Sequence, residues 1–155
     1  GEIASAEWSE IDIRKKCWEI PSAKTKNGKL NRVPLSKLAL ELLREAKQNS
    51  NDSRWLFPSP FNKLEDKAIA KGSLPHAVQK SLPIFGIDHF TPHDLRRTAA
   101  TQMAASGISR LVISKILNHV ESGITAIYDR HSYDKEKQKA LDKWSKRLEK
   151  IVKVS

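Results

Sequence analysis

The sequence contains one cysteine, Cys17, so no internal disulfide can form. No secretory signal is visible, and together these features predict a protein of the reducing cytoplasm. No long apolar run and no lipidation motif is present, so a membrane role is not expected. The six glycines form no phosphate-binding loop, the histidines and the cysteine lack the spacing of a zinc site, and no segment repeats.

Positive charge dominates the composition. The chain has 28 lysines and arginines against 18 aspartates and glutamates, which gives a formal net charge of +10. This balance favours a polyanionic partner, and nucleic acid is the leading candidate. The chain has 155 residues, of which 39% are hydrophobic. It is therefore long enough for one compact domain with a core, and too short for two domains to be expected.

The first third of the chain has strand-like patterns. The segments 8–13, 17–20 and 32–35 are rich in apolar side chains, and Asn27-Gly28 lies between the last two. Because Asn-Gly is a strong signal for a hairpin turn, we expect a small antiparallel sheet here. Cys17, in the second segment, is expected to be a small core residue.

The next part of the chain changes to helical spacing. Leu38, Leu42 and Ala46 follow Ser36, which is a good N-cap residue, and the pattern ends in a polar stretch. After this helix we expect mostly loop with one short element at 55–71, followed by a helix at 73–82. Further helices are expected at 92–106, before Gly107, and at 109–118, where Ser109 is the cap. A short segment at 125–130 and a final helix from about 134 onward complete the prediction.

An apolar stripe runs along the predicted last helix. Its members are Ala140, Leu141, Trp144, Leu148, Ile151 and Val152. The stripe indicates packing either against the domain's own core or against a neighbouring protomer. Together the patterns predict a mainly helical α+β fold with a small antiparallel sheet.

The run 91–98 combines a helix start with side chains that bind phosphate. Thr91 suits the N-cap, Pro92 the first helical position, and Asp94 can reach back to the cap. His93 and Arg96 are three residues apart and therefore share a helix face, beside the positive end of the helix dipole. The run thus predicts a phosphodiester site, although a solvated helix cap is the alternative.

Two further motifs follow this run. Leu117-Asn118-His119 comes next, and Tyr128 lies nine residues beyond His119. In this order, the set resembles the C-terminal box of the tyrosine recombinases, which are the integrases of temperate phages and genomic islands. The sequence departs from the family at Asn118, where glycine is common.

The resemblance extends toward the N-terminus. The segments 24–29 and 32–35 are similar to the family's β-hairpin, and counting back from Pro34 places its catalytic lysine at Lys26. The opening Gly1-Glu2-Ile3 is similar to the segment just after the family's first catalytic arginine. That arginine is expected two positions before Gly1, so residues 1–155 are expected to be a catalytic domain truncated at its N-terminus, with weak or absent cleavage on its own.

The resemblance also implies a chemistry. Tyr128 would attack the scissile phosphorus and form a 3′-phosphotyrosyl link, while Lys26 would protonate the departing 5′-oxygen. His93 would accept the phenolic proton and later return it. Arg96 and His119 would bind the non-bridging oxygens. No metal ion and no cofactor is implied.

DNA contacts and partners are expected on the same basis. The residues expected to contact DNA are Arg97, Arg130, His131, Lys24 and Lys29. The implied partners are double-stranded attachment sites, further protomers in a homotetramer, and accessory DNA-bending proteins. A separate upstream DNA-binding domain and a cytoplasmic, nucleoid-associated location are expected for the full protein.

Two alternatives remain open. The predicted helices between 92 and 118 could form a helix-turn-helix module that binds DNA without catalysis. A type IB topoisomerase would use similar residues but reseal the same strand, and the integrase-like spacing argues against it. At single positions, Tyr128 could be a core residue, His119 a helix C-cap, and Arg97 a salt-bridge partner.

Overall fold

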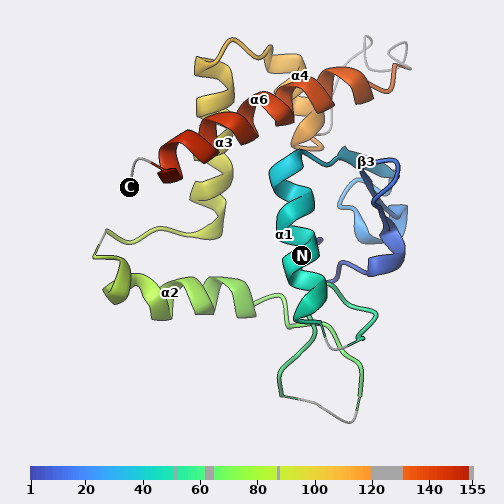
Figure 1. Cartoon of the computed structure of the whole chain (residues 1–155), viewed down its shortest axis with the longest axis vertical. Helices are drawn as coiled ribbons and strands as arrows, with labels where there is room; N and C mark the ends of the chain where they lie inside the picture. Colours follow the sequence, from blue (N-terminus) through green and yellow to red (C-terminus); the bar gives the residue numbers. More distant parts are fainter. Residues whose placement is uncertain (51, 62–64, 87, 120–130, 154–155) are drawn as a thin grey trace.

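A three-stranded antiparallel sheet forms one side of the molecule in the computed structural model (Figure 1). The structure describes residues 1–50, 52–61, 65–86, 88–119 and 131–153. The strands are β1 (Ile11–Asp12), β2 (Cys17–Ile20) and β3 (Asn31–Pro34), in the order β1-β2-β3. In β2 and β3, Cys17 pairs with Pro34 and Ile20 with Asn31. The predicted sheet is confirmed, and Cys17 is buried as expected.

The first predicted strand is mostly a helical turn. Residues Trp8–Glu10 form the 3-10 helix η1, and only Ile11–Asp12 join the sheet. The reason is local: the backbone N–H of Glu7 donates to Glu10 Oε2 at 3.4 Å, which offers the chain an alternative to a strand ladder. A prediction of a strand over 8–13 was therefore wrong for its first half.

Five helices are described, and three of them start at the predicted caps Ser36, Thr91 and Ser109. They are α1 (Lys37–Gln48), α2 (Ser73–Phe85), α3 (Pro92–Ala105), α4 (Arg110–Ile116) and α6 (Asp134–Lys153). Ser36 accepts a hydrogen bond from the Ala39 N–H at 3.3 Å, and Ser109 one from the Val112 N–H at 3.4 Å. Each bond satisfies an N–H that has no partner within its helix.

The end of α2 lies beyond its predicted limit. The helix continues past Pro83 to Phe85 and stops at Gly86, which has a φ of 61°. Proline removes one backbone donor, and in the last turn this does not end the helix, whereas the left-handed glycine does. No residue of α2 is buried, and among the helices and strands described it contacts α3.

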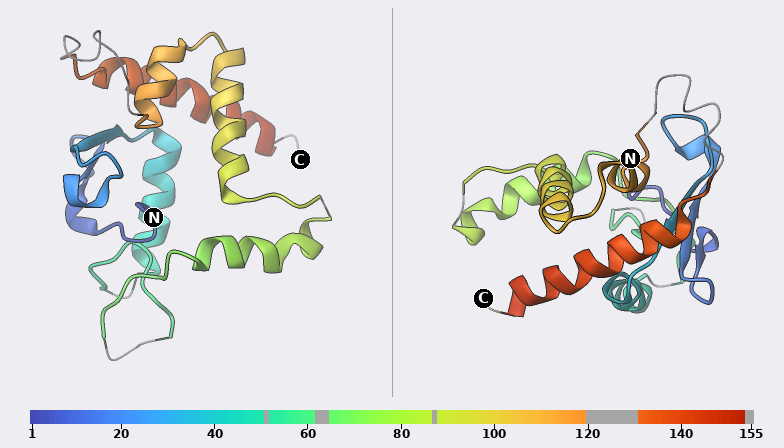
Figure 2. Two further views of the ribbon diagram at one scale, coloured as in Figure 1. Left: turned by 180° about the vertical axis from the view of Figure 1, so that it is seen from behind. Right: turned by 90° about the horizontal axis from the view of Figure 1, so that it is seen from above.

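Helix α6 crosses α1, α3 and α4 and also contacts β3 (Figures 1 and 2). It covers part of a core made of Ala4, Ala6, Cys17, Ile20, Leu35, Leu40, Leu56, Met103, Ile113 and Ala140. The apolar stripe of α6 therefore packs on the chain's own core over its first turns. Its tip differs, because Ile151 is 49% and Val152 66% exposed.

A buried lysine fixes α6 to the sheet. Lys137 is 6% exposed, and its ammonium group donates to the Arg32 carbonyl of β3 and lies 3.0 Å from Asp134 Oδ1. A buried charge needs such partners, so this contact determines where α6 meets β3. Of the helices in the described part of the chain, none is long and apolar enough to cross a membrane.

Candidate active site

The N-terminus of α3 has the predicted capping box. The carboxylate of Asp94 accepts hydrogen bonds from the Thr91 hydroxyl at 2.6 Å and the Thr91 backbone N–H at 3.0 Å. These two bonds, the side-chain bond first, lower the pKa of Asp94. The box orients the first turn of α3, on which His93 is exposed to solvent.

Arg96 connects α3 to the end of α4. Its guanidinium donates a hydrogen bond through Nη2 to the carbonyl of Leu117, the C-cap residue of α4. A cation at a helix C-terminus is favoured by the helix dipole. Because a guanidinium has about five N–H donors, this contact leaves others available to an anion, and the Arg96 side chain is exposed.

The turn after α4 presents His119. Asn118 has a φ of 52°, in the left-handed region. Its N–H donates to the Lys115 carbonyl at 3.2 Å, and the His119 N–H donates to the Ser114 carbonyl at 3.1 Å. This is the hydrogen-bond pattern of a helix that ends in a Schellman motif. The His119 side chain is exposed just beyond the helix end.

The loop between β2 and β3 reaches this turn. The Asn27 side-chain amide donates to Asn118 Oδ1 at 2.9 Å, across 91 residues of sequence. Within the loop, Thr25 is buried, and Gly28, with a φ of 66°, closes a turn by donating its N–H to the Thr25 carbonyl at 3.3 Å. The predicted turn at Asn27-Gly28 is confirmed, and Lys26 is exposed at this turn.

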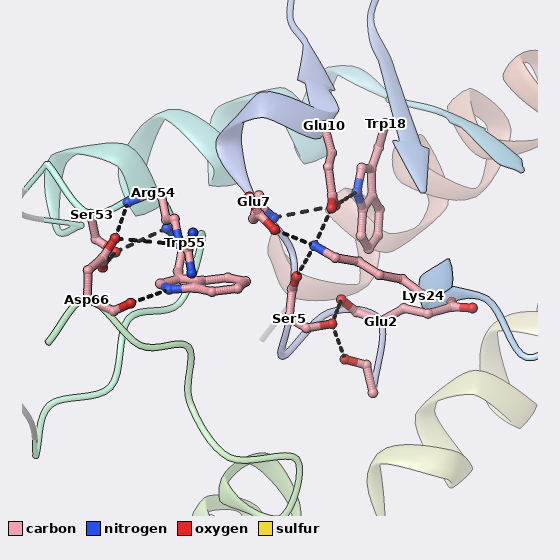
Figure 3. Close-up of polar contacts among 11 residues, drawn as sticks. Glu2, Ser5, Glu7, Glu10, Trp18, Lys24, Ser53, Arg54, Trp55 and Asp66 are labelled. Carbon is pink, nitrogen blue, oxygen red and sulfur yellow. Dashed lines mark hydrogen bonds and ion pairs between the residues drawn. The ribbon is translucent and has the colours of Figure 1, made fainter. Parts of the chain in front are cut away.

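Lys24 is held inside a cluster of carboxylates (Figure 3). Its ammonium group donates to Glu7 Oε1 at 2.8 Å, to the Ser5 carbonyl at 2.7 Å and to Glu10 Oε1. Glu10 also accepts from the Trp18 indole N–H at 3.1 Å. Burial by itself lowers the pKa of Lys24, but hydrogen bonds to Glu10 and Glu7 outweigh it and raise that pKa. The ammonium group therefore makes its hydrogen bonds to acceptors of the chain itself.

Of the other residues expected to contact DNA, three are exposed and one lies outside the described residues. Arg97 is exposed and lies 3.5 Å from Asp94 Oδ1, and Lys29 is exposed on the hairpin loop. His131 is exposed, with its Nε2 3.2 Å from Glu136 Oε1. Tyr128 and Arg130 lie outside the described residues, as does the segment predicted at 125–130.

The structure thus brings together three segments that carry expected site residues. Arg96 contacts the turn that precedes His119, and the loop that carries Lys26 contacts the same turn through Asn27. Sequence reasoning did not single out Asn27 as a site residue, and its only signal was the Asn-Gly turn. Across the described ranges, no group of three or more His, Cys, Asp or Glu side chains is arranged to hold a metal ion.

Known proteins are similar to this chain over most of its length. Residues 1–135 match the model of the phage integrase family. The prophage integrase IntA of Escherichia coli (strain K12) is 29% identical over 145 residues, which cover 93% of this chain and 34% of that protein. The tyrosine recombinase XerA of Pyrococcus horikoshii is 31% identical over 128 residues, which cover 82% of this chain and 44% of that protein.

The fold is also that of a known recombinase. A crystal structure of XerA recombinase matches with a TM-score of 0.66 at 22% identity, covering 96% of this chain and 52% of that one. The chain therefore belongs to the phage integrase family, with a mainly helical α+β fold as predicted. These matches do not favour a helix-turn-helix binding module or a topoisomerase. The chain spans about a third of the length of IntA and of the integrase of Enterobacteria phage P4.

Proposed function

We propose that the full-length protein is a site-specific DNA recombinase that integrates or excises a DNA element through a 3′-phosphotyrosyl intermediate. Membership of the phage integrase family supports this function. The observation that carries it is the convergence of Arg96, the His119 turn and the Lys26 loop. A phosphodiester at this point would meet a guanidinium, an imidazole and an ammonium group.

The proposed cleavage is one transesterification. The phenolic oxygen of Tyr128 forms a bond to the scissile phosphorus, and the bond from phosphorus to the 5′-oxygen breaks. His93 accepts the phenolic proton, and Lys26 donates a proton to the departing 5′-oxygen. Rejoining reverses these transfers: a 5′-hydroxyl attacks, its proton passes to Lys26, and the tyrosine oxygen leaves with the proton from His93.

Arg96 and His119 stabilise the charge that develops during this step. Arg96 offers a planar pair of N–H donors that matches two non-bridging phosphate oxygens. His119 donates a further hydrogen bond to the same group. The capped N-terminus of α3 adds the positive end of its helix dipole near His93.

The proposed partners are double-stranded attachment sites and three further protomers in a homotetramer. The net charge of +10 supports a DNA partner. Arg97, Lys29, Arg130 and His131 are the proposed backbone contacts, and Lys24 is left out because carboxylates hold its ammonium group. The exposed tip of α6 is the proposed contact between protomers. Accessory DNA-bending proteins and a cytoplasmic, nucleoid-associated location belong to the same proposal.

Covalent trapping tests the function. The full-length protein is incubated with nicked duplexes tiled across the DNA that flanks its gene, and detergent-resistant adducts are digested and sequenced by mass spectrometry. We expect a DNA adduct on Tyr128 that is lost in Tyr128→Phe and retained in the matched control Tyr133→Phe. Complexes that detergent dissolves, with no adduct on any duplex, contradict the proposal and indicate a DNA-binding module.

A second assay separates recombination from relaxation. Two duplexes that carry the trapped site are mixed, and exchanged strands are detected by their different lengths. A recombinase yields the exchanged products. Relaxation of supercoiled plasmid without exchange would instead indicate topoisomerase activity.

A further inference from the structure

The hydrogen bond between Asn27 and Asn118 joins two segments that each carry a proposed reacting group. Asn27 directly follows Lys26, and Asn118 directly precedes His119. The donor and acceptor are 2.9 Å apart, and both side chains are half-buried. Because each asparagine is bonded covalently to the neighbouring residue, the contact limits the separation between the backbones of Lys26 and His119.

Contacts within its own loop orient the side chain of Asn27. Its Oδ1 accepts a hydrogen bond from the Lys29 N–H at 3.1 Å, which is an Asx turn. The buried Thr25 hydroxyl lies 2.8 Å from the Lys29 carbonyl and holds the same loop. The side-chain oxygen of Asn27 is thus held by its own loop, and its side-chain N–H donates to Asn118 Oδ1.

Asn118 is oriented from the other side. The Schellman hydrogen bonds fix its backbone, and Arg96 holds the preceding carbonyl of Leu117. A left-handed residue at this position is easiest for glycine, which would complete the turn without any side chain. The turn alone therefore does not require a side chain at this position, whereas the contact with Asn27 requires one with an acceptor oxygen.

We propose that the Asn27–Asn118 hydrogen bond is a positioning contact that holds the Lys26 loop against the His119 turn, so that the general acid meets the phosphodiester bound by Arg96 and His119. This inference rests on the proposed function. Neither asparagine is a catalytic residue, since both act through their neighbours. Misplacement of the loop by about 1 Å is enough to slow a reaction by about 100-fold.

The leaving group offers a specific test. In DNA with a 5′-bridging sulfur, the departing thiolate is a far weaker base than an alkoxide and needs no proton from a general acid. A variant that misplaces Lys26 should therefore be defective on ordinary DNA and restored on the sulfur substrate. A variant that merely damages the fold should be defective on both substrates.

The experiment measures single-turnover cleavage by the full-length protein on both substrates, using the nicked duplex trapped above. We expect Asn118→Gly and Asn27→Ala to cleave ordinary DNA about 10- to 100-fold more slowly, with most of the loss recovered on the sulfur substrate. Because both substitutions remove the same hydrogen bond, the double variant should cleave no more slowly than the slower of the two single variants. The matched control is Asn49→Gly at the end of α1, where the amide donates to the Glu45 carbonyl at 3.1 Å, and it should cleave at the wild-type rate.

Lys26→Met separates the two proposals. Recovery of this variant on the sulfur substrate, together with wild-type rates or substrate-independent losses in both asparagine variants, would overturn the positioning contact and leave the proposed function intact. Absence of recovery in Lys26→Met would overturn the assignment of Lys26 as general acid, and the positioning role with it.

Discussion

The ammonium group of Lys24 lies 2.8 Å from a carboxylate oxygen of Glu7. Lys24 is two residues before Lys26, the lysine proposed as general acid. Lys24 also bonds to Glu10, whose side chain is only 7% exposed. The hairpin thus uses one lysine to fix its base to η1 and exposes another at its turn. Lys24 and Lys26 are two residues apart but have different environments, because only Lys24 contacts the carboxylates.

Replacing Lys24 tests this division. Lys24→Met leaves Glu10 and Glu7 without their shared donor, and we expect the free energy of unfolding to fall by about 1–3 kcal/mol. Denaturant unfolding followed by circular dichroism measures the change. Lys24→Arg, which keeps the charge, should recover part of it. Equal stability of the methionine variant and the wild type would show that the cluster contributes nothing.

The same cluster predicts a dependence on alkaline pH. Folding raises the pKa of Lys24 above its ordinary value of 10.5, so the folded state binds this proton more tightly. The resulting stabilisation is fully present below pH 10.5 and is lost as the pH rises through the higher pKa of the folded state. The stability difference between wild type and Lys24→Met should therefore narrow above pH 10.5, when both are unfolded by denaturant across this range.

The capping box of α3 gives a further prediction. Thr91→Ala removes the hydroxyl that bonds to Asp94, and loss of an N-cap side chain costs about 1 kcal/mol of unfolding free energy. Thr91→Ser keeps the hydroxyl and serves as the control. Because Thr91 lowers the pKa of Asp94, the stabilisation by this carboxylate is present above its ordinary pKa of 3.8 and is lost as the pH falls through the lower folded value. The alanine variant should show less of this acid dependence.

The helix starts were predictable because their causes are local. Ser36, Thr91 and Ser109 each act on an N–H or carboxylate three residues away, so the sequence around them contains the whole interaction. The order of His93, Arg96 and His119 was likewise readable as a motif. Local signals therefore predicted the helix starts and the family. The exceptions are the end of α2, which continues past Pro83, and the first strand, where the bond from Glu7 to Glu10 competes with sheet pairing.

The distant contacts were not predictable in the same way. Lys24 was expected to bind DNA, but its partners Glu7 and Glu10 are 17 and 14 residues away. Asn27 and Asn118 are 91 residues apart, and nothing in the sequence of either turn indicates the other. These pairs depend on how η1, the loop between β2 and β3, and the end of α4 are placed in space, which periodicity and spacing do not specify.

Gly107, at the end of α3, gives another prediction. It has a φ of 78°, and beyond its two neighbours in the chain no residue has an atom within 4 Å of the position that a Cβ would occupy. Gly107→Ala should therefore lose stability through backbone strain alone, by about 1 kcal/mol. Gly107→Asn should lose less, because asparagine tolerates the left-handed region better. Thermal unfolding of the three proteins gives this order, and equal stability of the alanine variant would refute the strain.

Arg96 and Arg97 are neighbours on α3 with different expected roles, and this contrast gives the last prediction. Arg96→Lys loses the planar fork and the bond to the Leu117 carbonyl, so we expect cleavage to slow on the order of 100- to 1000-fold. Noncovalent binding of the trapped duplex should persist. Single-turnover cleavage and gel retardation measure the two effects separately.

Arg97→Gln is the matched control for that change. The Arg97 side chain is 72% exposed and pairs only loosely with Asp94, at 3.5 Å. We expect cleavage within a few fold of the wild type at saturating protein, and a salt dependence of DNA binding that is weaker by about one ion. If Arg97→Gln slowed cleavage as much as Arg96→Lys does, cleavage would depend on the arginines of α3 in general. The assignment of Arg96 to the phosphate would then be wrong.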